Sequence, residues 1–213
     1  MKRCVIVAGA QINNYDFVRS YLSDDDYYIF CDSGLNHLEK LGVTPDLIVG
    51  DFDSYHEIPD FENLIKLPCE KDDTDSVFAV KEGLRLGFDD FLLIGMIGGR
   101  LDHSMGNISI LLKLDSLGKS AMIVDDYSEI EIISNKPAFI DDSFSYFSLL
   151  AINGTASDIN SENTKYPLEH STITCEYAYG VSNEVIPGKT AKIWLGSGSL
   201  LLIKVSGKII PKN

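Results

Sequence analysis

The sequence lacks any apolar run close to the ~18 residues that a membrane-spanning helix needs, and its four cysteines include no C-x-x-C pair. The first absence argues against a membrane protein, and the second argues against a zinc site or a redox pair. The basic start Met1-Lys2-Arg3 precedes a short apolar run that ends near Gln11, which indicates a first strand rather than a signal peptide. A soluble, cytoplasmic protein is the expectation.

Positive charge is also scarce. The chain has 18 Lys and Arg residues against 32 Asp and Glu residues, so its formal net charge is -14. Nucleic acids are bound through basic patches, and this balance therefore argues against a nucleic-acid partner. It does not exclude a nucleotide, because a bound metal ion can neutralise phosphate charge locally. Hydrophobic residues make up 45% of the 213 residues, enough for one large domain or two small ones.

The first half of the chain alternates short apolar runs with segments of helical period. This alternation is typical of a mostly parallel sheet with helices packed on it. We expect strands at residues 4–8, 27–31, 47–49, 64–67, 91–96 and 121–124, and helices at residues 14–22, 34–41, 74–86 and 101–117.

The pattern changes near Tyr127 to short segments rich in Ile, Val, Thr, Phe and Tyr, separated by Gly, Pro, Asn and Ser. That pattern favours an antiparallel β domain, a small sandwich or barrel. The predicted fold class is α/β, with a mostly parallel sheet flanked by helices and then a smaller C-terminal antiparallel β-sandwich. The predicted domains are residues 1–128 and 129–213, with β segments at 129–134, 138–140, 144–152, 171–176, 191–195 and 200–205.

Two acidic turns are the most informative local feature. Asp51 and Asp53 flank Phe52, and Asp75 follows about twenty residues later at the expected start of a helix that Thr74 or Asp73 can cap. Carboxylates this close repel one another unless a cation lies between them, and Mg²⁺ on carboxylates usually also holds phosphates. For either turn taken alone, the alternative of a solvated polar turn or a favourable helix start is the stronger one.

A third turn, Gly98-Gly99-Arg100, lies between an expected strand and an expected helix. Glycines let the backbone approach a ligand closely, the guanidinium fits phosphate oxygens, and the helix start favours an anion. Asp32 and Asp51 also follow expected strands directly. In an open α/β sheet, ligands bind beyond the carboxyl ends of the strands, so these turns are expected to meet at one edge.

Taken together, these segments resemble the thiamine pyrophosphokinase (thiamine diphosphokinase) family. The motifs keep the order of that family and span nearly the whole chain. Ser33 is a departure, because the family usually has glycine there, and it bears on the turn at the adenosine side rather than on the metal site. The matching segments are residues 32–36, 41–54, 71–75 and 98–103 in the first half, and residues 165–168 and 180–184 in the second half.

The resemblance implies an N-terminal α/β catalytic domain that binds ATP and Mg²⁺, and a C-terminal β-sandwich that binds thiamine. It also implies a homodimer with active sites near the subunit interface. The implied reaction moves the diphosphoryl group of ATP to the hydroxyl of thiamine, which gives thiamine diphosphate and AMP. Such transfers rely mainly on positioning and on charge stabilisation. The absence of a long apolar run predicts no membrane partner.

The resemblance also implies roles for individual residues. Asp51, Asp53 and Asp75 would hold Mg²⁺ and, with Arg100 and Asp102, would form the catalytic set. The nucleotide contacts would come from Asp32, Asn36, Lys71, Thr74 and Arg100, and Asp102, Ser182 and Asn183 would lie at the thiamine side. Tyr166 lies in the motif-like segment 165–168 and is a candidate aromatic wall for the pyrimidine of thiamine.

Two alternatives stay open at this stage. A related diphosphokinase acting on a pterin alcohol would use the same scaffold, and a non-catalytic sensor of nucleotide or thiamine would share the pockets. The intact set of carboxylates and Arg100 argues against the sensor. Whether Asp102 or a metal-bound carboxylate accepts the proton of the hydroxyl is also open.

Overall fold

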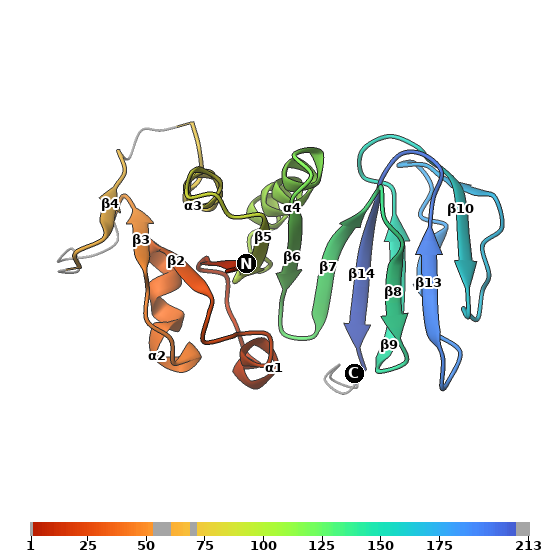
Figure 1. Ribbon diagram of the computed structural model, residues 1–213, viewed down its shortest axis with the longest axis horizontal. Helices are drawn as coiled ribbons and strands as arrows, with labels where there is room; N and C mark the ends of the chain where they lie inside the picture. Colours follow the sequence, from red (N-terminus) through yellow and green to blue (C-terminus); the bar gives the residue numbers. More distant parts are fainter. Residues whose placement is uncertain (1, 53–60, 69–71, 208–213) are drawn as a thin grey trace. The chain divides into compact units, whose positions relative to one another are not determined.

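The computed structural model describes residues 2–52, 61–68 and 72–207. The chain divides into two compact units, one ending at Asp126 and the other beginning at Tyr127 (Figure 1). Each unit has a hydrophobic core of its own. The two units are therefore described separately.

The first unit is built on a parallel sheet. Its strands lie in the spatial order β6-β5-β1-β2-β3-β4, and each neighbouring pair is parallel. The chain first extends the sheet on one side of β1 and then returns to its other side, so the order reverses at β1. The strands are β1 (Cys4–Val7), β2 (Tyr27–Cys31), β3 (Leu47–Gly50), β4 (Leu64–Lys66), β5 (Asp90–Ile94) and β6 (Ser120–Val124).

Helices cover both faces of this sheet (Figure 1). α3 (Asp75–Arg85) and α4 (Leu101–Ser116) lie on one face, and α1 (Tyr15–Arg19) and α2 (Leu38–Leu41) lie on the other. Thr74 caps α3, because its hydroxyl accepts a hydrogen bond from the backbone N–H of Val77 at 3.3 Å. The predicted cap at residue 73 or 74 is therefore confirmed for Thr74.

Alternation along the strands decides which residues enter each side of the core. Val5 and Val7 of β1 pack with Tyr28 and Phe30 of β2 and with Leu92 of β5 on the α1 face of the sheet. Cys4 and Ile6 point to the opposite face, as expected for residues one position away on a strand. Because β1 is buried at every position, it reads as a continuous apolar run.

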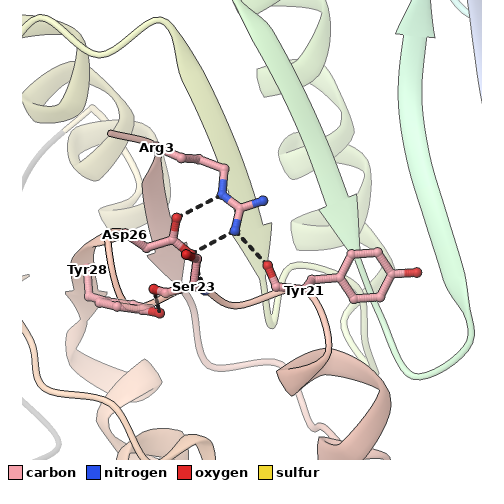
Figure 2. A network of polar contacts seen from close by, with 5 residues as sticks. All are labelled: Arg3, Tyr21, Ser23, Asp26 and Tyr28. Atoms are coloured by element: carbon pink, nitrogen blue, oxygen red, sulfur yellow. Dashed lines mark hydrogen bonds and ion pairs between the residues drawn. The ribbon is translucent and has the colours of Figure 1, made fainter. Parts of the chain in front are cut away.

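An ion pair ties the start of β1 to the loop before β2. The guanidinium of Arg3 donates to both carboxylate oxygens of Asp26, at 3.1 and 2.7 Å, and to the carbonyl of Tyr21 at 2.6 Å (Figure 2). The same carboxylate accepts the backbone N–H of Ser23 at 2.9 Å, and the hydroxyl of Tyr28 donates to the carbonyl of Ser23. In the acidic run 24–26, Asp26 therefore has a structural role, with a side chain that is only 4% exposed.

The second unit is an antiparallel sandwich. One layer has the order β12-β9-β14-β7 and the other has the order β11-β10-β13-β8. Buried residues from both layers, among them Ile133, Phe147, Ile159 and Ile193, form one core. The strands are β7 (Ser128–Ile133), β8 (Ala138–Asp141), β9 (Phe144–Leu150), β10 (Ala156–Glu162), β11 (Ser171–Ile173), β12 (Gly180–Asn183), β13 (Thr190–Trp194) and β14 (Leu200–Ser206).

The predicted fold class is thus confirmed, with local differences. The predicted helix 14–22 ends at Arg19, because Tyr21 and Leu22 bond to carbonyls three residues back and tighten the last turn. The predicted helix 34–41 is a 3₁₀ helix, η1 (Asp32–His37), followed by the single turn α2. In the ranges that the structure describes, no helix is long and apolar enough to cross a bilayer.

Candidate active site

A pocket of about 350 Å³ opens at the carboxyl ends of the parallel strands. It lies where the strand order reverses around β1, which is where open α/β sheets bind ligands. The loop after β1, the end of β2, the loop after β5 and the first turns of α3 and α4 all contribute to its wall. The lining residues with polar side chains are Gln11, Ser33, Thr74, Asp75, Ser76, Arg100, His103, Ser104 and Asn107.

Three carboxylates predicted from the sequence gather beside this pocket. Burial raises the pKa of Asp32, and so do the nearby charges of Asp75 and Asp51, whereas backbone hydrogen bonds from Ser33 and Phe52 lower it. Because the charges of Asp75 and Asp51 act on Asp32, the ends of β2 and β3 and the start of α3 lie near one another. The expectation that the turns after the strands meet at one edge is confirmed for Asp32 and Asp51, and Gly98 and Arg100 line the same pocket as Ser33.

Asp32 also organises the turn that follows β3. Its carboxylate accepts the backbone N–H of Phe52 at 3.3 Å, and Phe52 is buried with a φ of 57°. A Cβ placed on Gly50 would lie 2.5 Å from the Cβ of Asp32, so only glycine permits this approach. The turn therefore buries Phe52 while Asp51 stays partly accessible beside Asp32.

Arg100 and Asp102 form a two-contact ion pair at the start of α4. The guanidinium donates to the two carboxylate oxygens at 3.2 and 2.6 Å, and both side chains are exposed. The hydrogen bond from Arg100 lowers the pKa of Asp102 to about 2. A carboxylate held in this way is a weak proton acceptor at neutral pH.

Two buried residues of α4 were not among the predicted site residues. The hydroxyl of Ser104 accepts the backbone N–H of Gly98 at 3.0 Å, and the amide of Asn107 donates to the carbonyl of Met96 at 2.8 Å. They fix the loop that carries Gly98 and Arg100 into the pocket wall. Their positions three and six residues after the predicted helix start at Leu101 were the available signal, because such residues face the preceding loop.

Asn36 is not among the residues that line this pocket. Its amide donates to the carbonyl of Ser33 at 3.0 Å, and it lines a second, shallower pocket of about 500 Å³. The two pockets share Gln11 as a wall residue. The other residues that line the second pocket are Ile12, Asn13, Tyr15, His37 and Lys40.

In the second unit, Tyr166 and Asn183 line a pocket of about 230 Å³. The side chain of Asn183 is buried and holds the backbone of Tyr166 from both sides. Its Oδ1 accepts the N–H of Tyr166 at 3.1 Å, and its Nδ2 donates to the Tyr166 carbonyl at 2.7 Å. Ser182 is exposed, has a φ of 59° and donates its N–H to the hydroxyl of Ser148. Asn183 thus holds the backbone of Tyr166, a residue that is 58% exposed.

Two predicted site residues, Asp53 and Lys71, lie outside the described residues. Within the described ranges, no group of three or more His, Cys, Asp or Glu side chains is arranged to hold a metal ion. The predicted metal set includes Asp53, so it cannot be complete within those ranges. The donors that are described, Asp51 and Asp75, offer hard carboxylate oxygens beside Asp32, and this donor chemistry fits Mg²⁺.

Comparisons with known proteins agree with this arrangement of a pocketed α/β unit followed by a β-sandwich. Residues 18–123 match the family model described as thiamin pyrophosphokinase, catalytic domain. Residues 130–200 match the model described as thiamin pyrophosphokinase, vitamin B1 binding domain. The chain belongs to the thiamin pyrophosphokinase family.

Individual relatives extend over nearly the whole chain. The thiamine pyrophosphokinase of Bacillus subtilis is 28% identical over 212 residues, which cover 96% of this chain and 99% of that protein. Its crystal structure superposes with a TM-score of 0.85 at 26% identity, covering 97% of this chain and 100% of that one. The thiamin pyrophosphokinase structure from Geobacillus thermodenitrificans gives a TM-score of 0.80 at 27% identity, covering 96% and 97%.

Proposed function

We propose that this chain is a thiamine diphosphokinase, a transferase that moves the diphosphoryl group of ATP to the hydroxyl of thiamine and releases AMP. The observation that carries this proposal is the match of both family domains, in order, to the two units of the chain. The assignment of ATP and Mg²⁺ binding to residues 1–128, and of thiamine binding and dimerisation to residues 129–213, is part of the proposal.

ATP is proposed to bind in the pocket of the α/β unit. Thr74, Asp75 and Arg100 line that pocket, and Asp32 lies beside Asp75. The start of α4 has no side-chain cap, so its first backbone N–H groups suit phosphate oxygens. Lys71 and Asn36 complete the proposed nucleotide contacts, Asn36 from the neighbouring second pocket.

Mg²⁺ is proposed to bind Asp51, Asp53 and Asp75. When bound, it would supply positive charge for the phosphate oxygens of ATP. The support within the described residues is that the charges of Asp75 and Asp51 raise the pKa of Asp32, a repulsion that a bound cation would relieve. Asp32 itself is committed to the backbone of the Asp51 turn, so its proposed role is to hold the turn in place.

The proposed reaction is a single displacement. The hydroxyl oxygen of thiamine attacks the β-phosphorus, the bond between that phosphorus and the bridging oxygen to the α-phosphate breaks, and AMP leaves. Arg100 would exchange its contact with Asp102 for a phosphate oxygen and offset the negative charge that develops there. The ion pair makes Asp102 a weak proton acceptor, and its exchange frees the Asp102 carboxylate to take the hydroxyl proton, for which a carboxylate of Asp51 or Asp75 is the alternative.

The thiamine side is proposed to comprise Asp102, Tyr166, Ser182 and Asn183. The thiazolium ring is cationic, so the carboxylate of Asp102 suits it, and the exposed ring of Tyr166 offers a face for the pyrimidine. Asn183 would act through Tyr166, because its amide is taken up by the Tyr166 backbone. A cytoplasmic homodimer is proposed as the working form.

Product analysis tests this function. The purified protein is incubated with ATP, Mg²⁺ and thiamine, and the products are separated by chromatography. We expect thiamine diphosphate and AMP in equal amounts. Formation of ADP and thiamine monophosphate would overturn the diphosphoryl transfer, and AMP formed only with a hydroxymethyl pterin would favour the pterin enzyme. ATP binding with no product from either acceptor would indicate a sensor.

A further inference from the structure

A buried histidine behind the main pocket has no part in the proposed chemistry. His37 ends η1, is only 6% exposed and does not line the main pocket. Both of its ring nitrogens have partners. Nε2 lies 3.0 Å from the carbonyl oxygen of Ala10, and Nδ1 lies 2.7 Å from the hydroxyl of Tyr15.

These partners fix the proton on the ring. A carbonyl oxygen can only accept a hydrogen bond, so Nε2 must carry a hydrogen and donate it to Ala10. Burial lowers the pKa of His37 and nearby Lys40 lowers it further, although the Ala10 hydrogen bond raises it. In the neutral ring that burial favours, Nδ1 is an acceptor, and the hydroxyl of Tyr15 donates to it.

Ala10 lies between this histidine and the main pocket. Its backbone N–H donates to the carbonyl of Gly95 at 2.9 Å, just after β5. A Cβ placed on Gly98 would lie 2.8 Å from the Cβ of Ala10, so the two residues touch across the pocket wall. Ala10 and Gly98 both line the pocket, and Gly98 lies two residues before Arg100. Any shift of Ala10 therefore moves the loop that carries Arg100.

We propose that His37, which donates from Nε2 to the Ala10 carbonyl and is anchored at Nδ1 by Tyr15, is a positioning residue that sets Ala10 against Gly98 and so fixes the width of the nucleotide pocket. This proposal rests on the proposed function in one respect, namely that ATP binds in the main pocket. His37 touches neither substrate in this role, and its effect falls on ATP affinity. The affinity for thiamine and the rate at saturating ATP depend on it far less.

Two substitutions at the same position separate this role from general packing. In His37→Gln the amide nitrogen occupies the place of Nε2 and can still donate to Ala10. In His37→Asn the shorter amide occupies the place of Nδ1 and leaves the Ala10 carbonyl without its donor. We expect KM for ATP to stay within about twofold for H37Q and to rise about fivefold or more for H37N, with KM for thiamine unchanged in both.

Tyr15→Phe and Glu39→Gln serve as companions. The first removes the hydroxyl that anchors Nδ1 of His37, and we expect KM for ATP to rise about twofold to fivefold. The second changes an exposed side chain of α2 that lines neither pocket, and it should leave KM for ATP unchanged. Thermal unfolding of every variant is recorded alongside, and Y15F decides the question if H37N does not fold.

The outcomes are distinct. Equal KM values for H37Q and H37N, or a Y15F enzyme with an unchanged KM for ATP, would overturn the positioning role. Loss of kcat at unchanged KM for ATP would also overturn it. A wild-type protein that shows no ATP binding by calorimetry and no turnover would instead refute the proposed function itself.

Discussion

At the scale of single residues, burial decides which cysteine thiols can react. Cys4 is fully buried in β1, and burial together with the charges of Asp46 and Asp26 raises its pKa to about 12. Cys175 in the second unit is exposed. Only the thiolate is nucleophilic, and at pH 8 a thiol with a pKa near 12 is ionised in about one molecule in ten thousand.

We therefore expect iodoacetamide at pH 8 to label Cys175 in the native protein and to leave Cys4 unmodified until urea is added. Peptide mass spectrometry measures both sites in one sample. Because the pKa of Cys4 is raised in the folded state above the ordinary value of 9.0, the free energy of unfolding should also fall as the pH rises above 9.

Cys175 serves as the internal control for reagent and time. Modification of Cys4 at the rate of Cys175 would show that β1 opens readily, and the burial argument would then fail. A free energy of unfolding that does not change between pH 9 and pH 11 would contradict the stability part of the prediction.

The carboxylates illustrate what could be predicted residue by residue. The convergence of Asp32 and Asp51 followed from parallel strands that end at one edge, a rule that needs only sequence order. The pairing of Arg100 with Asp102 could not be predicted, because it depends on side-chain rotamers. The same holds for Asn183, whose hold on Tyr166 joins residues seventeen positions apart.

At the scale of elements, the pair of Arg3 and Asp26 joins β1 to the loop before β2. The Asp26 side chain is 4% exposed and that of Arg3 is 23% exposed, so the carboxylate is largely out of water (Figure 2). Removing one partner of such a pair leaves an uncompensated charge. A pair in water, by contrast, contributes little.

We expect Arg3→Met to lower the free energy of unfolding by about 3 kcal/mol. The matched control is Arg19→Met, which breaks the exposed pair of Arg19 with Asp16 and should cost no more than about 0.5 kcal/mol. Urea unfolding followed by circular dichroism measures both. Equal losses for the two variants would show that Asp26 finds other partners, and the burial of the pair would then be irrelevant to stability.

Elements were predicted best where apolar periodicity was regular. The strands of the parallel sheet were found because buried runs such as 91–96 are continuous. β10 was missed because a residue with positive φ, Asp158, interrupts it between Ala156 and Ile159. The resulting bulge places its apolar residues three positions apart, which breaks the alternation that identifies a strand. β12 was not predicted as a strand because it has too few apolar residues to show an alternating pattern.

At the scale of the whole molecule, the net charge of -14 acts on stability. An excess of one sign of charge destabilises the compact state by self-repulsion, and salt screens that repulsion. The carboxylates at the ends of β2 and β3 and the start of α3 add a local excess that a divalent ion could relieve specifically.

We expect the melting temperature to rise by a few degrees between about 20 and 300 mM NaCl. MgCl₂ at the same ionic strength should raise it further, because the proposed metal site binds Mg²⁺ only in the folded protein. Asp51→Asn should abolish the additional rise and keep the NaCl effect. Differential scanning calorimetry provides this readout independently of activity.

Each part of that result can fail separately. A melting temperature that falls with NaCl would mean that ion pairs outweigh the net repulsion. Equal effects of NaCl and MgCl₂ on the wild-type protein would count against the metal site. An additional Mg²⁺ effect that survives in D51N would place the ion elsewhere.

The lack of a side chain at Gly50 has a consequence for reading related sequences. Position 50 requires glycine because a Cβ there would clash with the Cβ of Asp32, eighteen residues earlier. The backbone conformation does not impose this requirement, since φ at Gly50 is not positive. Any larger residue at position 50 could be accommodated only if position 32 also lost its side chain, and with it the carboxylate. Glycine at position 50 is thus required by any side chain at position 32, so position 50 is expected to change only where position 32 is glycine, whereas position 32 can change alone.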